Sequence, residues 1–189
     1  MAKIILGFVG PIASGKEVAK KYIAEKYGAK DCKFSAPLRD VVRRLGLEES
    51  RENLQRLSTV LRGAFGEDLL AKAISVDAAK LDAGIVIVDG VRRMTDIAHL
   101  KDLPNFHLVA IDAGPEIRYE RMKKRNENKG DDKKTFAEFQ ADQEKEADRE
   151  IPAVMKRADI HIDNGGTLEH LYAQIDAFVG ALRVGKQAP

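Results

Sequence analysis

The stretch Ile4–Lys16, IILGFVGPIASGK, decides the fold. Its first six residues form a short apolar run of the kind that makes a buried strand. Its last seven, Gly10–Lys16, place two glycines and a lysine at the spacing G-x-x-x-x-G-K. The glycines let the backbone curl so that successive N–H groups point inward. A helix predicted over Glu17–Tyr27 directs its positive N-terminus at the same point, so the stretch predicts a cradle for phosphate oxygens.

This spacing is that of a Walker A loop, and it lies in the strand–loop–helix context that the motif requires. We expect the loop to bind ATP, with the ammonium of Lys16 reaching the β- and γ-phosphates. The residues expected to contact the nucleotide are Gly10, Ala13, Ser14, Gly15, Lys16, Glu17 and Val18. Glu17 stands where Ser or Thr normally supplies a magnesium ligand, and the sequence leaves its role open. A turn with incidental glycines is the disfavoured alternative.

The rest of the chain alternates short apolar runs with longer helical patterns. Further strands are expected at 31–35, 85–88, 106–111 and 159–163. Helices are expected at 17–27, 37–45, 50–65, 67–81, 95–103, 116–126, 135–150 and 167–182. This alternation predicts an α/β fold of three layers, with helices on both faces of a parallel sheet of about five strands. Ligands of such sheets bind beyond the carboxyl ends of the strands.

Composition limits the classes of protein that the chain can represent. Its 189 residues, 44 % of them hydrophobic, suit a single domain over 1–189. A formal net charge of only +2 gives no reason to expect nucleic acid as a partner. The single cysteine, Cys32, excludes an internal disulfide and fits a reducing, cytoplasmic compartment. No segment approaches a membrane span, and we expect a monomer or weak dimer with a small-molecule partner.

The second apolar run, Ile85–Val88, ends in an acid. It is β-branched throughout and delivers Asp89 to the edge of the sheet beside the phosphate loop. There a carboxylate can hold magnesium, usually through water, or orient the acceptor. Arg92 and Arg93 follow, and a planar guanidinium suits bidentate contact with phosphate. The alternatives are a turn aspartate and, for one of the two arginines, a solvated surface residue.

Two further segments carry candidate residues. Ser35 and Arg39 follow the second predicted strand, so they are expected to face the phosphate loop and bind an acceptor phosphate, within a helical acceptor-binding insert at 36–82. Arg121 and Arg125 share one helix face because they lie four residues apart. The segment 116–134 holds eight basic and five acidic side chains, and 138–150 holds six acidic and two basic ones.

We interpret 122–140 as a short lid over ATP, with Arg121 and Arg125 acting on the transferred phosphoryl group and Arg121 also on the nucleotide. A solvated helical hairpin is the alternative, because charge runs are usually surface. Arg62 is a candidate for an extra phosphate contact, although a surface position is the favoured interpretation.

These residues resemble the nucleoside monophosphate kinase superfamily over nearly the whole chain. The similar segments are the phosphate loop Gly10–Lys16, the acceptor stretch Ser35–Arg39, the DGVRR stretch Asp89–Arg93, and the lid pair Arg121 and Arg125. The resemblance implies ATP and Mg²⁺ as cofactors and an enzyme that transfers a phosphoryl group to a nucleoside monophosphate. It implies that Arg39 and Arg93 bind the acceptor phosphate and that Asp89 is the acid on the magnesium side.

The chain departs from that superfamily after the lid. Gln140–Gln143 occupies the region where the family places an arginine, and Arg149 is the candidate to replace it. Ala158–Gly165 is similar to a pattern of dephospho-coenzyme A kinases. Ser35–Arg39 and Arg92–Ile97 look like stretches of animal-type phosphomevalonate kinases, and deoxynucleotide monophosphate kinases share the Pro-Leu-Arg feature.

Three functions therefore stay open. The first is a nucleoside or deoxynucleoside monophosphate kinase. The second is a dephospho-coenzyme A or phosphomevalonate-type kinase. The third is a nucleotide-binding protein without transfer activity.

Overall fold

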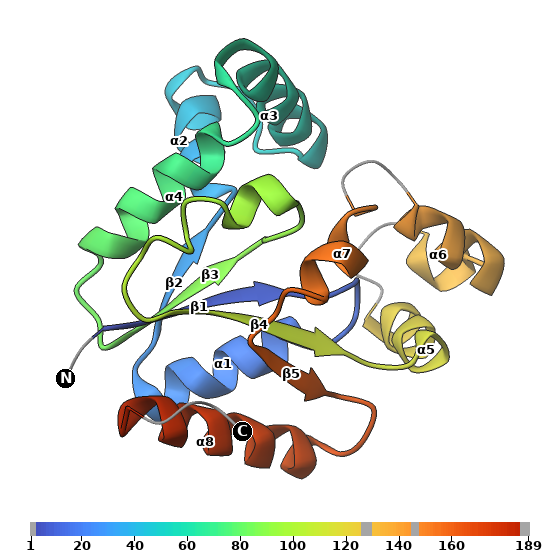
Figure 1. The fold of residues 1–189 in the computed structure, drawn as a ribbon. Coiled ribbons are helices and arrows are strands. Elements are labelled where there is room, and N and C mark those ends of the chain that lie inside the picture. The colour runs from blue at the N-terminus through green and yellow to red at the C-terminus, as the bar shows by residue number, and fades with distance from the viewer. Residues whose placement is uncertain (1–2, 126–129, 145–147, 186–189) are drawn as a thin grey trace.

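The chain folds around one parallel sheet, seen in a computed structural model that describes residues 3–125, 130–144 and 148–185. The strands are β1 (Ile4–Val9), β2 (Lys30–Lys33), β3 (Ile85–Asp89), β4 (Phe106–Asp112) and β5 (Ile160–Asp163). They lie in the order β2-β3-β1-β4-β5, and each adjacent pair is parallel (Figure 1). The predicted five-stranded parallel sheet is confirmed.

The register brings the ends of three strands to one edge of the sheet. Phe8 of β1 and Lys33 of β2 both pair with Asp89, the last residue of β3. Every residue of β1 is buried, because the strand lies at the centre of the sheet with helices on both faces. The loop that leaves β1 at Gly10 therefore emerges beside Asp89.

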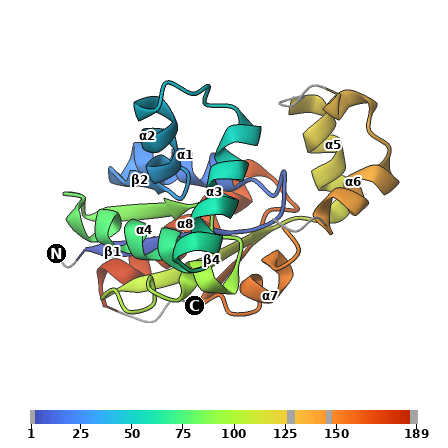
Figure 2. The same cartoon turned by 90° about the horizontal axis from the view of Figure 1, so that it is seen from above.

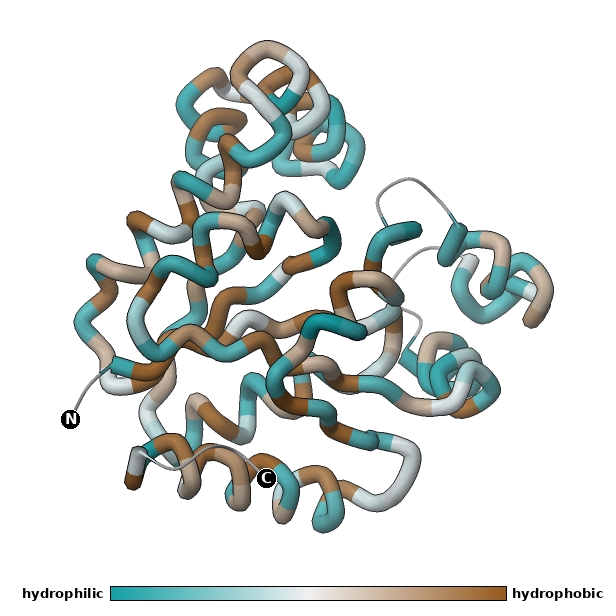
Figure 3. The backbone as a smooth tube through the Cα atoms, in the orientation of Figure 1, coloured by the Kyte–Doolittle hydropathy of each residue, from teal (hydrophilic) through white to brown (hydrophobic). Residues whose placement is uncertain are grey.

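Helices cover both faces of the sheet, which gives the three layers expected (Figure 1). One face is covered by α1 (Lys16–Tyr27) and α8 (Leu168–Arg183), and the other by α4 (Leu69–Lys80) and the short α7 (Ile151–Met155). Alternate residues of each strand supply the two cores. In β1, Leu6 and Phe8 pack on the side of α1 and α8, and Ile5 and Val9 pack on the side of α4. Figure 3 shows the strands as the most hydrophobic part of the chain.

Two helical pairs project from the sheet and lie apart from each other (Figure 2). One pair is α2 (Ala36–Arg44) and α3 (Arg51–Phe65); the other is α5 (Pro115–Arg125) and α6 (Phe136–Gln143). A short 3-10 turn, η2 (Asp131–Lys133), precedes α6. Side chains cap the starts of α3 and α6, since Ser50 accepts from the amide of Asn53 and Thr135 accepts from that of Glu138. Within the described residues, no helix combines the length and apolar composition that crossing a membrane requires.

Two helix predictions were wrong in extent. The segment predicted as a helix over 95–103 holds only the 3-10 turn η1 (Met94–Ile97), followed by turns. The cause is Asp96, whose carboxylate accepts from backbone amides before it and ties the segment into a tight cap. The helix predicted over 135–150 ends at Gln143, and a separate helix, α7, begins at Ile151. Residues 126 and 145–147, which belong to predicted helices, lie outside the described residues.

Candidate active site

The phosphate loop, Gly10–Lys16, has the backbone that its glycines predict. Gly15 has φ +100°, and Ala13, although it carries a Cβ, has φ +60°. A Cβ at Gly10 would lie 2.1 Å from the carbonyl oxygen of Ile111, and one at Gly15 would lie 1.9 Å from Nδ2 of Asn164. Both glycines are thus required by close approach, and Ala13 carries backbone strain of the kind that gathers at binding loops.

Asn164 holds this loop from the far end of the chain. It follows β5, its side chain is buried, and its Nδ2 donates to the carbonyl oxygen of Ser14 at 2.8 Å. The segment Ala158–Gly165, which the sequence singled out as a pattern, therefore braces the phosphate loop. The sequence could show the pattern but not this contact, which spans 150 positions.

The loop offers unpaired polar groups at the start of α1. The helix begins without a side-chain cap, so its first N–H groups are available to an anion. The Oγ of Ser14 is buried and has no hydrogen-bond partner among the residues the structure describes. The Nζ of Lys16 folds back and donates to the carbonyl oxygens of Gly10 and Pro11 at 2.6 and 2.9 Å. A polyphosphate would give this ammonium charged partners, which bind it more strongly.

Charged side chains from other parts of the chain change the pKa of Lys16. Burial lowers the pKa of Lys16 to about 8, Asp89 and Asp148 oppose that shift, and Arg92 and Arg125 add to it. The structure thus brings Asp89, Arg92 and Arg125, all predicted site residues, to the same region as the loop lysine. Asp148 was not singled out from the sequence; its only signal was the acidic run 138–150.

A buried lysine on α1 lies beside Asp89, the predicted magnesium ligand. Lys20 is 2 % exposed, and its Nζ donates to Oδ2 of Asp89 at 2.8 Å. The same ammonium lies 2.8 Å from Oε2 of Glu17 and 3.5 Å from Oδ2 of Asp31. Although burial disfavours its charge, the hydrogen bonds to Asp89 and Glu17 raise the pKa of Lys20. The sequence analysis missed Lys20, whose place one turn after Lys16 was the available signal.

The donor set fits magnesium held together with a nucleotide. Within 3–125, 130–144 and 148–185, no three His, Cys, Asp or Glu side chains gather in a group that could hold a metal. Magnesium does not need such a group, because it usually takes one or two carboxylates and fills its other positions with water and substrate phosphates. Asp89, with its side chain 22 % exposed beside the phosphate loop, fits that requirement.

Each arginine predicted for the acceptor phosphate contacts a carboxylate. Arg39 donates to Glu49 at 2.8 Å. Arg92 donates to Asp148 at 2.9 Å, and Arg93 donates to Glu67 at 3.1 Å. In each pair a carboxylate is the anion that holds the guanidinium group in place.

The loop that carries Arg92 and Arg93 is fixed by a buried ion pair. Oδ2 of Asp96 accepts from the backbone amides of Arg92 and Arg93, each at 3.0 Å, and its Oδ1 accepts from Arg62 of α3 at 2.8 Å. Arg62 also donates to the carbonyl oxygen of Glu67. The prediction that Arg62 is a surface residue was wrong, because its partner Asp96 lies 34 positions away and allows the guanidinium to be buried.

On α5, two arginines have distinct surroundings. Arg118 is buried, donates to the side chain of Gln143 at 2.7 Å, and lies 5.5 Å from the ring centre of Phe139. Gln143, in the region where the resembled family has an arginine, therefore joins α6 to α5. Nη1 of Arg121 is buried without a hydrogen-bond partner among the described side chains and backbone. Such an orphan donor suits an anionic ligand.

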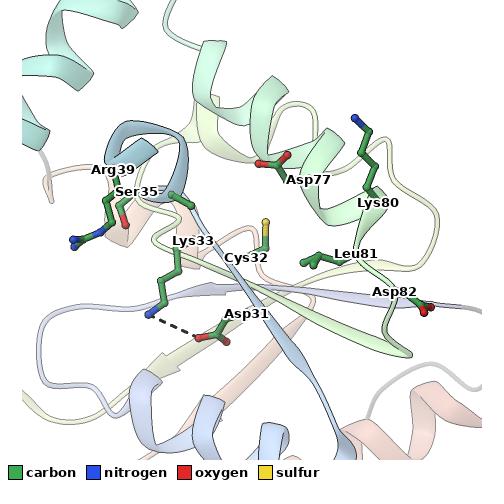
Figure 4. Close-up of a pocket in the computed structure, with 10 residues that line it drawn as sticks. Asp31, Cys32, Lys33, Ser35, Arg39, Asp77, Lys80, Leu81 and Asp82 are labelled. Atoms are coloured by element: carbon green, nitrogen blue, oxygen red, sulfur yellow. Dashed lines mark ion pairs between the residues drawn. The ribbon is translucent and has the colours of Figure 1, made fainter. Parts of the chain in front are cut away.

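A pocket of about 540 Å³ lies along the outer edge of β2 (Figure 4). It is lined by the residues Asp31, Cys32, Lys33, Ser35, Ala36, Arg39, Asp77, Lys80, Leu81 and Asp82. Cys32 points from β2 toward α4, and burial raises the pKa of its thiol to about 11. Ser35 and Arg39 lie at this pocket, which no residue of the phosphate loop lines.

Comparison with known proteins agrees with this geometry. Residues 9–140 match the AAA domain family. A UPF0200 protein from Hyperthermus butylicus is 31 % identical over 180 residues, which cover 95 % of this chain and 95 % of that protein. The chain belongs to the UPF0200 proteins and the AAA domain family.

Two of the solved structures that share the fold of this UPF0200 family member are kinases. A shikimate kinase from Bacteroides thetaiotaomicron aligns with a TM-score of 0.61 at 11 % identity, over 95 % of this chain and 98 % of that one. A gluconokinase from Sinorhizobium meliloti 1021 aligns with a TM-score of 0.54 at 16 % identity, over 96 % and 93 %. At such low identities the likeness concerns the fold alone. The predicted P-loop kinase fold is confirmed.

Proposed function

We propose that this protein is an ATP-dependent phosphotransferase whose acceptor is a small phosphate-bearing molecule, with a nucleoside or deoxynucleoside monophosphate as the first candidate. The observation that carries the proposal is the phosphate loop, whose Lys16 begins α1 and whose strand β1 pairs with the end of β3 at Asp89, with Arg92 and Arg93 following directly. Phosphoryl transfer needs this set, because charge spreads over the oxygens of the transferred group and must be met by fixed cations.

The donor half of the reaction falls to the phosphate loop. Its backbone amides and the start of α1 would hold the ATP phosphates, and Lys16 would leave its two carbonyl partners for the β- and γ-oxygens. Asp89 would hold a magnesium ion, usually through water. When bound, that ion neutralises charge on the phosphates. Arg121 and Arg125 of α5 would approach the nucleotide at the start of the segment 122–140, of which 126–129 lie outside the described residues.

The acceptor half falls to the arginines that now contact carboxylates. A phosphate dianion carries more charge than a carboxylate and accepts from a guanidinium in a bidentate manner, so it would displace Glu49 from Arg39 and Glu67 from Arg93. Ser35 and Arg92 would add further contacts. In this proposal the segment 36–82 supplies the acceptor side.

An acceptor panel tests the proposal. ADP release from ATP and Mg²⁺ is measured with each ribonucleoside and deoxynucleoside monophosphate, with dephospho-coenzyme A and with phosphomevalonate. Lys16→Ala serves as the blank for contaminating kinases. We expect a nucleoside monophosphate to raise ADP release well above the ATP-only rate. If dephospho-coenzyme A or phosphomevalonate alone does so, the acceptor assignment fails. If no compound does so, phosphotransfer to these acceptors is excluded and nucleotide binding without transfer remains.

A further inference from the structure

One ammonium on α1 joins three carboxylates at the edge of the sheet. Nζ of Lys20 lies 2.8 Å from Asp89 at the end of β3, 2.8 Å from Glu17 on its own helix, and 3.5 Å from Asp31 on β2. Lys20 is 2 % exposed, and α1 otherwise buries small or apolar residues, such as Ala19 and Ile23. An apolar side chain would fill this place without the cost of burying a charge, which calls for an explanation.

The geometry explains two features of the loop that the sequence left open. The hydrogen bond from Lys20 uses Oδ2 of Asp89, so the ammonium restricts this carboxylate to one orientation and leaves Oδ1 as the oxygen that would accept from a metal-bound water. The ion pair with Glu17 draws the carboxylate at the end of the phosphate loop along α1. Without this pair, the negative charge of Glu17 would be free to approach the ATP phosphates and repel them.

We propose that Lys20 is a positioning residue, which orients Asp89 toward the magnesium ion of a bound nucleotide and keeps Glu17 away from the phosphates. The inference rests on the donor half of the proposed function and not on the acceptor. Lys20 acts through Asp89 and touches neither nucleotide nor metal itself. Groups that orient a metal ligand typically change metal affinity by about 10- to 100-fold when they are removed.

The test measures ATP binding by calorimetry, with Mg²⁺ and with EDTA, so it needs no acceptor and no turnover. The quantity of interest is the magnesium gain. We define it as the dissociation constant of ATP in EDTA divided by the dissociation constant of ATP in Mg²⁺. Lys20→Met should reduce this gain by about tenfold or more. The matched control is Lys26→Met, because Lys26 lies on the same helix and its Nζ is 2.7 Å from Asp176, away from the loop. The control should keep the wild-type gain.

A double-mutant cycle separates positioning from a general loss of structure. If Lys20 acts through Asp89, then Lys20→Met should change the magnesium gain little in an Asp89→Asn background. Effects of the two substitutions that add independently would overturn the proposal, as would a folded Lys20→Met variant with the wild-type gain.

If Lys20→Met does not fold, Lys20→Arg is the second variant. It keeps the positive charge but replaces the single hydrogen bond to Asp89 with a guanidinium that can donate to both carboxylate oxygens. The gain should then also fall, and a wild-type gain in Lys20→Arg would refute the role given to Oδ1. The two proposals can fail separately. If the protein transfers phosphate to no acceptor but these variants still lose the magnesium gain, the proposed function is refuted and the role of Lys20 is supported.

Discussion

The phosphate loop and the acceptor arginines differ in what holds them in place. The loop is fixed by backbone: Gly10 and Gly15 have no room for a Cβ, and Asn164 is bonded to the carbonyl of Ser14. The arginines are fixed by side chains, since Arg39 and Arg93 rely on the exposed or partly exposed carboxylates Glu49 and Glu67. The backbone of the phosphate loop therefore suits one kind of ligand. The arginines can instead exchange a carboxylate partner for another anion, such as a phosphate.

The largest expected effect comes from a substitution in the phosphate loop. Lys16→Ala removes the only side-chain cation within the loop, and we expect ATP-dependent transfer to fall by about a thousandfold or more. The measurement is ADP release with the best acceptor, together with ATP affinity. Lys21→Ala is the control, because Lys21 lies on α1 but is solvent-exposed. A Lys16→Ala variant that retains a tenth of the wild-type rate would contradict the donor assignment.

Next in size is the buried ion pair of Arg62 with Asp96, which lies on the side of the acceptor arginines. Asp96→Ala leaves the guanidinium of Arg62 buried without its carboxylate and frees two amides, so the free energy of unfolding should fall by about 3 kcal/mol. Urea denaturation followed by circular dichroism measures this. Asp102→Ala, at an exposed position of the same segment, should change it by less than about 0.5 kcal/mol. A loss below about 1 kcal/mol would mean that the pair does not hold the loop.

A smaller effect is expected from a single acceptor arginine. Arg39→Ala should raise the acceptor KM by about tenfold or more, because a charged hydrogen bond is lost, while ATP affinity stays unchanged. Arg43→Ala is a close control, since Arg43 also pairs with Glu49 from α2. Equal effects of the two substitutions would point to Glu49, and not to Arg39, as the group that matters.

The smallest effect concerns pH on the donor side. The pKa of Lys16 is about 8 before a ligand binds, and phosphates should raise it. Below this pKa the lysine is already charged, so ATP affinity should be flat. Above it, binding must take up a proton, and affinity should fall with rising pH by at most about tenfold per unit. Calorimetry at about pH 9 in two buffers of different ionisation enthalpy measures the uptake, which Lys16→Arg should abolish.

How much of the site the sequence could predict depends on whether a feature is encoded by neighbouring residues or by distant partners. The strand Ile4–Val9, the phosphate loop and the acid at Asp89 were readable because each is encoded by neighbouring residues. Lys20 and Arg62 were missed because their burial depends on partners, Asp89 and Asp96, that lie 69 and 34 positions away. The helix expected at 95–103 failed for a different, local reason, since Asp96 accepts from the amides of Arg92 and Arg93 instead of continuing a helix.

The contact of Asn164 with Ser14 has a consequence for synthesis of the chain. While the ribosome is still making the last strand, β5, the amide that braces the loop does not yet exist, although the loop itself left the exit tunnel long before. A nascent chain that has not yet reached Asn164 should therefore hold the phosphate loop less firmly. We expect such a chain to bind ATP more weakly than the folded protein, so nucleotide would contribute little to the early steps of folding.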